Sequence, residues 1–224
     1  MFASSFWEAC FLRIAAVVPA YNEAVRIRSV ISAIRDSKAT DEIIVVSDGS
    51  TDDTYEVAKS EPGVYAVKLT QNVGKGGAML AGASETDADL LAFFDADLIG
   101  LKPHHVRELV EVVANGSADM SIGVFRGGWW LTDLSQRLVP YISGQRVVPR
   151  GFFLSVPGLS TARFGVEMAI GKHARACGLR VSTVVLHGVT HTIKEEKLGF
   201  WRGLISRGRM YSEILRSMLN GHEP

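Results

Sequence analysis

The sequence has little cysteine, no excess of charge of either sign and no long apolar run. Its two cysteines, Cys10 and Cys177, suggest free thiols in a reducing compartment, with one disulfide as the alternative. Lysine plus arginine equal aspartate plus glutamate at 24 each, which argues against a dedicated nucleic-acid-binding protein. No run reaches the roughly 18 apolar residues of a membrane span, and residues 1–10 lack the basic segment of a signal peptide. We therefore expect a cytoplasmic protein, either soluble or peripheral at the inner face of the membrane.

Apolar residues make up 47% of the 224 residues, which is enough for the core of a single domain over 1–224. Up to about residue 125, short apolar segments alternate with segments of helical periodicity. This alternation predicts an α/β fold with a mostly parallel central sheet flanked by helices. The expected strands span residues 14–18, 43–46, 64–69, 90–94, 118–124 and 181–186.

The stretch 90–97 has five apolar residues followed by two acids, Asp95 and Asp97. The apolar run predicts a strand buried on both faces, and ligands bind outside the carboxyl ends of strands in such sheets. Two like charges there favour a bound cation, and Mg²⁺ or Mn²⁺ carrying phosphate oxygens suits carboxylate ligands. The alternative is a solvated strand end whose acids form a turn and cap a helix.

Polar clusters also follow the first two expected strands, at 19–23 and 47–54. Pro19 is expected to end the first strand, and Asn22 to cap the following helix. Because the carboxyl ends of parallel strands lie at one edge, these clusters should converge with the acids of 95–97. The glycine-rich segment 70–78 suits phosphate contact but matches neither common nucleotide-binding pattern, and its alternative role is helix packing.

The later part of the chain is less periodic. Residues 125–160 are rich in glycine, arginine and aromatics, which predicts a substrate loop or lid, with a surface arginine face as the alternative. Glu167 lies in apolar surroundings on an expected helix, and His191 follows the last expected strand. The segment 194–219 is a basic amphipathic helix, which would lie on a membrane surface or pack on its own domain or on a second subunit.

Four motifs in order, at 17–23, 47–52, 72–76 and 95–97, resemble family 2-type glycosyltransferases of the GT-A fold. The segments 143–146, 164–167 and 188–191 are similar to glucosyl-3-phosphoglycerate synthases and, next, to polyprenyl-phosphate sugar synthases. The resemblance implies a nucleotide-sugar-binding half at 14–125, an acceptor-binding half at 126–193 and the C-terminal helix at 194–219.

The resemblance implies a donor site built from the ends of three strands and the start of the glycine-rich helix. Its members are Pro19, Tyr21 and Glu23 for base and ribose, Asp48 for the base, Lys75 for base or phosphate, Asp95 for the ribose or the metal, and Ala96.

The resemblance also implies a metal site and an acceptor site. Asp97 would bind Mg²⁺ or Mn²⁺, with Asp95 and His191 as further ligands. Glu167 would address the acceptor hydroxyl or the sugar, and an acceptor loop would be formed by Gly144 and Arg146. The residues expected to be catalytic are Asp97, Glu167 and Lys75.

The resulting hypothesis is a metal-dependent glycosyltransferase that moves a hexose, with UDP-glucose as first donor, to a small phosphorylated or polyprenyl-phosphate acceptor. A metal ion would neutralise the departing diphosphate. Glu167 would be the base in an inverting reaction, whereas in a retaining one the departing phosphate would take the proton. The alternatives are a nucleotidyltransferase and a catalytically silent nucleotide-sugar-binding or membrane-surface adaptor protein. A homodimer is a further candidate assembly.

Overall fold

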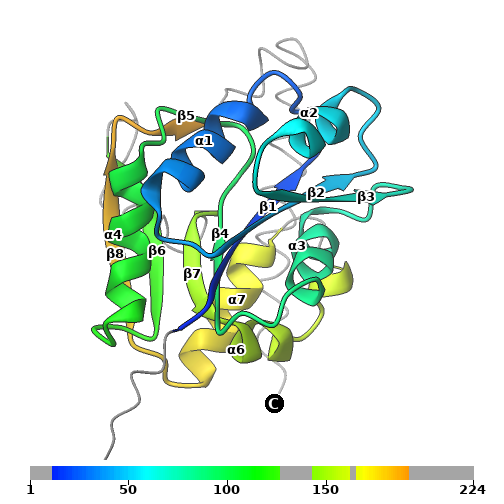
Figure 1. The fold of residues 1–224 in the computed structure, drawn as a ribbon. Helices are drawn as coiled ribbons and strands as arrows, with labels where there is room; N and C mark the ends of the chain where they lie inside the picture. The colour runs from blue at the N-terminus through cyan, green and yellow to red at the C-terminus, as the bar shows by residue number, and fades with distance from the viewer. Residues whose placement is uncertain (1–11, 127–142, 162–164, 192–224) are drawn as a thin grey trace, which may run out of the picture.

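The computed structural model describes residues 12–126, 143–161 and 165–191 (Figure 1). Its centre is a 7-stranded sheet in the order β3-β2-β1-β4-β7-β6-β8, and β5 and β9 form a second, two-stranded sheet. The strands are β1 (Ile14–Ala20), β2 (Glu42–Asp48), β3 (Val64–Leu69), β4 (Leu90–Phe93), β5 (Leu98–Ile99), β6 (Met120–Arg126), β7 (Arg146–Pro149), β8 (Val181–His187) and β9 (Thr190–His191). The helices are α1 (Ile27–Ser37), α2 (Thr54–Ser60), α3 (Lys75–Ser84), α4 (Pro103–Ala114), α6 (Arg150–Ser155), the 3₁₀ helix η1 (Leu159–Thr161) and α7 (Val166–Ala176).

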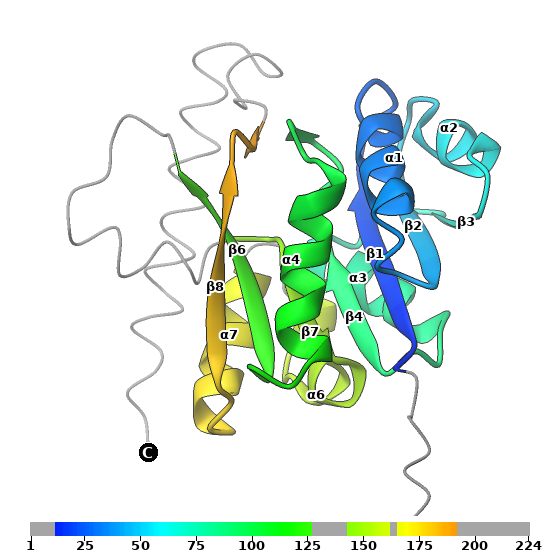
Figure 2. The same ribbon diagram turned by 60° about the vertical axis from the view of Figure 1, so that its left-hand side comes forward.

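Helices cover both faces of the large sheet (Figures 1 and 2). Successive residues of a strand point to opposite faces, so each buried strand contributes to two cores. In β1, Ala16 and Val18 join the core beneath α1, α2 and α4, whereas Ala15 and Val17 join the core beneath α3, α6 and α7. This arrangement confirms the predicted α/β fold and explains why the central strands are apolar without alternation.

The sheet contains two parallel blocks joined by one reversed strand. In the first block β3, β2, β1 and β4 are parallel, and in the second β6 and β8 are parallel. Between them β7 runs antiparallel to both β4 and β6. In its register with β4, Phe93 pairs with Arg146, so the beginning of β7 lies beside the end of β4.

Helix α3 packs unusually close to the sheet at Gly82. A Cβ atom added there would lie 2.5 Å from Val17 Cγ1 and 3.0 Å from Val46 Cγ2, which is too close for any larger residue without movement. Gly82 therefore serves helix packing at this end of α3, while Lys75 begins the helix at its other end.

The prediction that Pro19 ends the first strand is wrong. β1 continues to Ala20, and Pro19 pairs with Val46 of β2. On the β4 side, however, pairing ends at Val17 with Phe93, so β1 has a single neighbour at Pro19. Proline is compatible with a strand position that has a neighbour on one side only.

The prediction of a loop or lid over 125–160 is also wrong for much of its described part. Residues 146–149 form strand β7 and residues 150–155 form helix α6. Each element is too short to produce a periodic pattern, and Pro149 marks the junction between them. Within this stretch, residues 127–142 lie outside the described residues.

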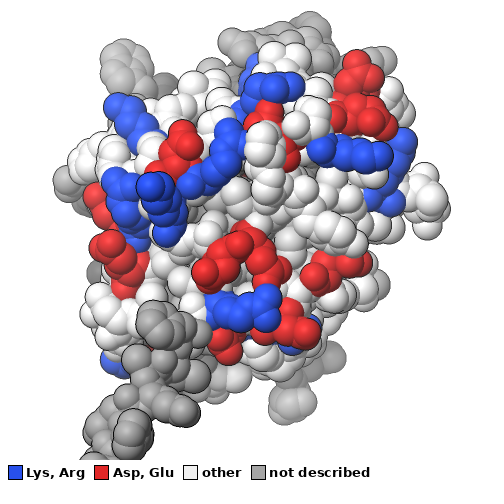
Figure 3. Space-filling model, viewed as in Figure 1, with Lys and Arg blue, Asp and Glu red and all other residues white. Residues whose placement is uncertain are grey.

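The expected helix at 194–219 lies outside the described residues as well. Within the part of the chain that the structure describes, no helix has the length and apolar character needed to cross a membrane. Figure 3 shows acidic and basic side chains interspersed over the face that it draws, so this face has mixed charge.

Candidate functional site

The loops after β1 and β2 are tied together by hydrogen bonds. Asn22 has a φ of 55° and its Oδ1 accepts the N–H of Thr51 at 2.9 Å, while its own N–H donates to Ser50 Oγ at 3.2 Å. Asparagine tolerates this left-handed conformation and often bonds nearby backbone. The predicted capping role of Asn22 is therefore wrong, because α1 begins at Ile27 and its N-cap, Arg26, makes no side-chain cap.

The predicted donor residues of the first loop lie at this edge. Tyr21 is 49% exposed, whereas Glu23 is buried and its N–H donates to Thr54 Oγ1 at 2.8 Å. Pro19 is the penultimate residue of β1, and Ala96 is buried between the two acids that follow β4. The convergence expected from parallel strand ends is thus observed for the first two loops.

Asp48, at the end of β2, fastens the loop that leads to α3. Its carboxylate accepts the N–H of Val73 at 2.8 Å and of Gly74 at 3.0 Å, and its carbonyl oxygen accepts Asn72 Nδ2 at 3.2 Å. Asp48 is buried, so these bonds replace the water that its carboxylate loses. The loop that Asp48 holds delivers Lys75 as the first residue of α3.

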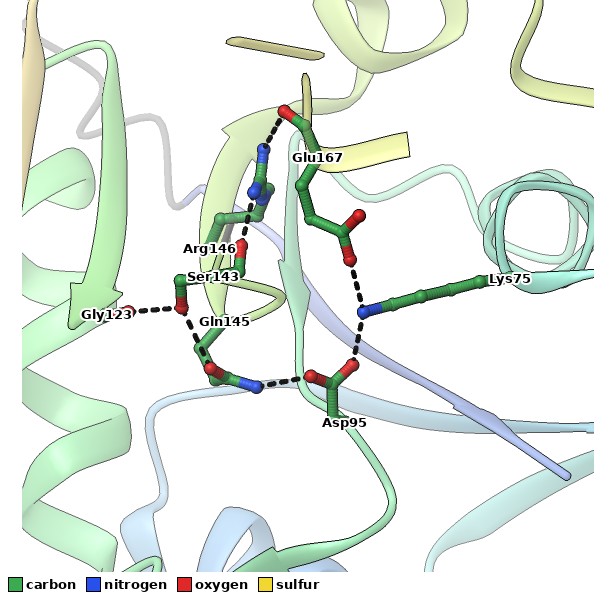
Figure 4. Close-up of polar contacts among 7 residues, drawn as sticks. All are labelled: Lys75, Asp95, Gly123, Ser143, Gln145, Arg146 and Glu167. Atoms are coloured by element: carbon green, nitrogen blue, oxygen red, sulfur yellow. Dashed lines mark hydrogen bonds and ion pairs between the residues drawn. The ribbon is translucent and has the colours of Figure 1, made fainter. Parts of the chain in front are cut away.

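Lys75 joins two carboxylates from distant parts of the chain (Figure 4). Its Nζ lies 2.6 Å from Asp95 Oδ1, just after β4, and 2.6 Å from Glu167 Oε1 in the first turn of α7. The three side chains are 27%, 16% and 14% exposed, in that order. Burial by itself would lower the pKa of Lys75, but the charges of Asp95 and Glu167 outweigh it and raise the pKa above its usual value. Lys75 is therefore a fixed positive charge at this edge.

Gln145 binds the other oxygen of Asp95. Its Nε2 donates to Asp95 Oδ2 at 2.8 Å, and its Oε1 accepts the Ser143 hydroxyl at 2.9 Å. The Ser143 hydroxyl also contacts the carbonyl oxygen of Gly123 on β6. Both oxygens of Asp95 thus have a partner, Lys75 on one and Gln145 on the other.

Gly144 is required by the closeness of this cluster. A Cβ atom added to Gly144 would lie 2.6 Å from both Asp95 Oδ1 and Lys75 Nζ. Any side chain at position 144 would therefore push Lys75 and Asp95 apart.

Arg146 lies inside the protein and is 1% exposed. Its Nη1 donates to the carbonyl oxygen of Glu167 at 3.3 Å, and its Nη2 donates to that of Ser143. Burial lowers the pKa of Arg146, and the nearby charges of Glu167 and Asp95 partly oppose that shift. The sequence predicted an arginine at the acceptor or on the surface, whereas this guanidinium contacts main-chain carbonyls in the interior.

Asp97 lies two residues beyond Asp95 and immediately before β5. β5 pairs antiparallel with β9, with Leu98 opposite His191, so the chain brings residues 97 and 191 to one place. The side chain of His191 lies outside what the structure describes. Among the described residues, no group of three or more His, Cys, Asp or Glu side chains is arranged to hold a metal ion.

Two members of the cluster were not predicted from the sequence, Ser143 and Gln145. The sequence argument looked for site residues after the carboxyl ends of strands, whereas Ser143 and Gln145 precede strand β7. The signal that was available is the resemblance of the segment 143–146, which contains both residues.

Residues 15–170, more than half of the chain, match the sequence profile described as glycosyl transferase family 2. The chain belongs to this family. The GT-A type of fold expected from the resemblance is confirmed by solved structures. Glucosyl-3-phosphoglycerate synthase of Mycobacterium tuberculosis, in complex with Mn²⁺, UDP and phosphoglyceric acid, matches with a TM-score of 0.76 and 28% identity. That match covers 94% of this family 2 chain and 78% of the synthase chain.

Curated relatives include both groups suggested by the sequence. The same mycobacterial synthase is 37% identical over 194 residues, covering 70% of this chain and 59% of the synthase. Undecaprenyl-phosphate 4-deoxy-4-formamido-L-arabinose transferase of Sodalis glossinidius is 37% identical over 111 residues, 46% of this chain and 34% of that protein. Dolichol-phosphate mannosyltransferase of Pyrococcus furiosus is 32% identical over 117 residues, 50% of this chain and 33% of that protein. The chain thus spans about a third to three fifths of the length of these relatives.

Proposed function

We propose that this chain is a metal-dependent hexosyltransferase, with UDP-glucose as its first candidate donor and a phosphorylated small molecule or a polyprenyl phosphate as acceptor. The observation that carries the proposal is the joining of Asp95, Lys75 and Glu167 at the edge where the first two loops also meet. Family membership supports the reaction class, and the UDP and Mn²⁺ in the mycobacterial synthase support the donor and the cofactor.

The protein side chains at this edge suit a divalent cation that is coordinated mainly by phosphate oxygens of the substrate. Because Lys75 and Gln145 bind the two oxygens of Asp95, Asp97 is the carboxylate that we assign to the metal, with His191 as the candidate second ligand. One or two protein ligands suffice for Mg²⁺ or Mn²⁺ when phosphate oxygens complete the coordination. When bound, the ion would neutralise charge that develops on the diphosphate.

Lys75 and Glu167 are the residues that we assign to the transfer step itself. Transfer breaks the bond between the anomeric carbon and the diphosphate oxygen, which leaves with the electron pair, and forms a bond to the acceptor oxygen. Lys75 adds a positive charge that needs no reorganisation, because it is already fixed by two carboxylates. The acceptor proton goes to Glu167 if the anomeric configuration inverts. It goes to the departing diphosphate if the configuration is retained, and Glu167 then orients the acceptor.

The test is a panel of nucleotide sugars incubated with Mg²⁺ or Mn²⁺ and with phosphoglyceric acid or a short polyprenyl phosphate. Release of nucleoside diphosphate, abolished by a chelator and restored by excess metal, supports the proposal, and the mass of the product identifies the acceptor. The anomeric coupling constant of the product then decides the role of Glu167. Release of pyrophosphate would instead indicate a nucleotidyltransferase. UDP binding without turnover of any donor would contradict the proposal and favour a silent nucleotide-sugar-binding protein.

A further inference from the structure

Two adjacent polar residues at the start of β7 are almost completely buried. Gln145 is 0% and Arg146 is 1% exposed. Figure 4 shows their side chains extending in opposite directions, Gln145 toward Asp95 and Arg146 toward the first turn of α7. A buried amide and a buried guanidinium are each unfavourable unless bonded, so their partners indicate what they do.

Gln145 has its amide orientation set from behind. The Ser143 hydroxyl donates to Gln145 Oε1, which leaves Nε2, a pure donor, facing Asp95 Oδ2. Asp95 is thereby bound on both sides and its carboxylate cannot rotate without losing a bond to Gln145 or to Lys75. Gln145 therefore fixes the direction in which Asp95 meets Lys75.

Arg146 acts on the other carboxylate through the backbone. It joins the carbonyl oxygens of Ser143 and Glu167, and so links the segment before β7 to the start of α7. A positive charge near the amino end of a helix is unfavourable, because that end already carries partial positive charge. Its Nε, moreover, has no hydrogen-bond partner among the described residues. The carboxylates of Glu167 and Asp95 offset only part of the cost of burying this guanidinium. A buried arginine that joins these two segments is therefore better explained by the position that it gives to Glu167.

We propose that Gln145 and Arg146 are positioning residues for the transfer reaction: Gln145 orients Asp95, Arg146 orients Glu167, and the two carboxylates therefore meet on Lys75. The proposal deepens the proposed function and rests on it for its kinetic test. It predicts that neither side chain binds donor or acceptor directly. A second test, the chemical reactivity of Lys75, does not depend on turnover.

The kinetic test uses the full chain with the substitutions Gln145→Ala and Arg146→Met. Misplacement of a reacting group by about 1 Å is enough to reduce the rate about 10²-fold. We expect kcat to fall about tenfold to a hundredfold, while KM for the donor changes less than about threefold. A rise in KM with kcat unchanged would mean direct substrate binding and would overturn the proposal.

A conservative substitution separates positioning by Arg146 from the effect of its charge. Arg146→Lys keeps the positive charge but cannot make both contacts with the carbonyl oxygens of Ser143 and Glu167, so we expect kcat to stay reduced, as in Arg146→Met. Parent-like kcat in Arg146→Lys would mean that the charge alone is needed and would overturn this part.

The test without turnover is acetylation of Lys75 by an acylating reagent, measured by peptide mass spectrometry relative to exposed Lys38 in the same sample. In the parent we expect Lys75 to react at least about tenfold more slowly, because two carboxylates hold its Nζ and its side chain is only 27% exposed. Gln145→Ala and Arg146→Met should each speed its reaction about threefold or more, because the carboxylates would no longer be held against Nζ.

Arg180→Met is the matched control, because Arg180 is an exposed arginine bonded to Asp119 away from this cluster. It should leave both kcat and the Lys75 to Lys38 ratio unchanged. If the parent turns over a donor but the ratio is the same in all variants, the positioning roles are refuted and the proposed function stands. If no donor is turned over but the ratio rises as expected, the proposed function fails and the positioning of Lys75 is supported.

Discussion

The first parallel block of the sheet and the reversed strand β7 contribute to the site in different ways. In the block β1–β4, site residues follow strands, so Asp48 and Asp95 stand at or just beyond a strand end. At the reversed strand β7 they come before it, at Gln145 and at Arg146, its first residue. Both groups of site residues therefore lie at the same edge of the sheet. A site residue follows its strand or precedes it according to the direction in which that strand runs.

The blocks also differ in what holds them. The first is fastened near its functional edge by buried bonds, such as those of Asp48 to Val73 and Gly74. The second is fastened at the opposite end by Arg180, whose backbone N–H, Nε and Nη2 donate to Asp119 and whose guanidinium also donates to the carbonyl oxygens of Gly116 and Ser117. Substitutions in the two blocks should therefore differ in kind, with loss of activity expected in one and small pH-dependent changes in stability in the other.

The largest effect is expected for Asp97→Asn in the first block. The substitution keeps the shape of the side chain and removes the charge that we assign to the metal. Release of nucleoside diphosphate should fall about 10³-fold, and UDP binding should lose its dependence on Mn²⁺. Asp119→Asn, in the second block, is the control and should keep full activity. If Asp97→Asn retained more than a tenth of the parent activity, the assignment of Asp97 to the metal would be contradicted.

A smaller effect is expected at the point where the blocks meet. Gly144→Ala would bring a methyl group against Asp95 and Lys75, and we expect activity to fall roughly tenfold to a hundredfold by misplacing them. Gly151→Ala is the matched control on the same segment, because a Cβ atom there meets nothing within 4 Å. As a helix residue it should gain up to about 1 kcal/mol of stability without a change in activity. Equal activity in the two variants would argue against the closeness of the cluster.

Asp48→Asn tests whether Asp48 stabilises the loop that leads to α3 in the first block. The amide keeps one acceptor and loses the other, so one of the two buried N–H bonds from Val73 and Gly74 is lost. We expect the free energy of unfolding in urea to fall by about 1–2 kcal/mol. The surface substitution Asp36→Asn on α1 serves as the control and should change it by less than about 0.5 kcal/mol. A change at Asp48 no greater than that at Asp36 would contradict the fastening role.

The smallest effect is expected for Asp119→Asn in the second block. Hydrogen bonds from Arg180 hold the pKa of Asp119 below its ordinary value of 3.8. A carboxyl group whose pKa is lowered in the folded state adds stability above its unfolded pKa and loses it as the pH falls through the folded value. The parent should thus exceed the variant slightly in Tm at neutral pH, and the difference should vanish as the pH falls through the lowered pKa of Asp119. A difference that grew on acidification would have the wrong sign.

The first block could be predicted from sequence because its rules are simple. Buried parallel strands are continuous apolar runs, so 43–46 and 90–94 stand out, and polar residues after them mark the functional edge. Asp48, Asp95 and Lys75 were located in this way or by resemblance. What the sequence could not show is that Asp48 would bind the backbone of the next loop, since that depends on how the two loops meet.

The strands β6 and β8 of the second block were predicted as well, at 118–124 and 181–186, but the reversed strand β7 between the blocks was not. β7 is four residues long and reversed, so neither its length nor its polar flank marks it as a strand. Arg146 looked like a surface or acceptor residue, because an arginine with 1% exposure requires partners that only the fold provides. The pairing of β5 with β9 was likewise invisible, because two strands of two residues carry no periodic pattern.

The close approach of α3 to the sheet makes Gly82 a remote determinant of the charge cluster. Gly82 and Lys75 are seven residues apart on one rigid helix, or about 10 Å at 1.5 Å per residue. A bulkier residue at 82 would press on Val17 and Val46 and tilt the helix, so that its far end carried the lysine out of reach of Asp95. A substitution at this buried glycine, which contacts no substrate, would then reduce the rate of the reaction before it unfolded the protein.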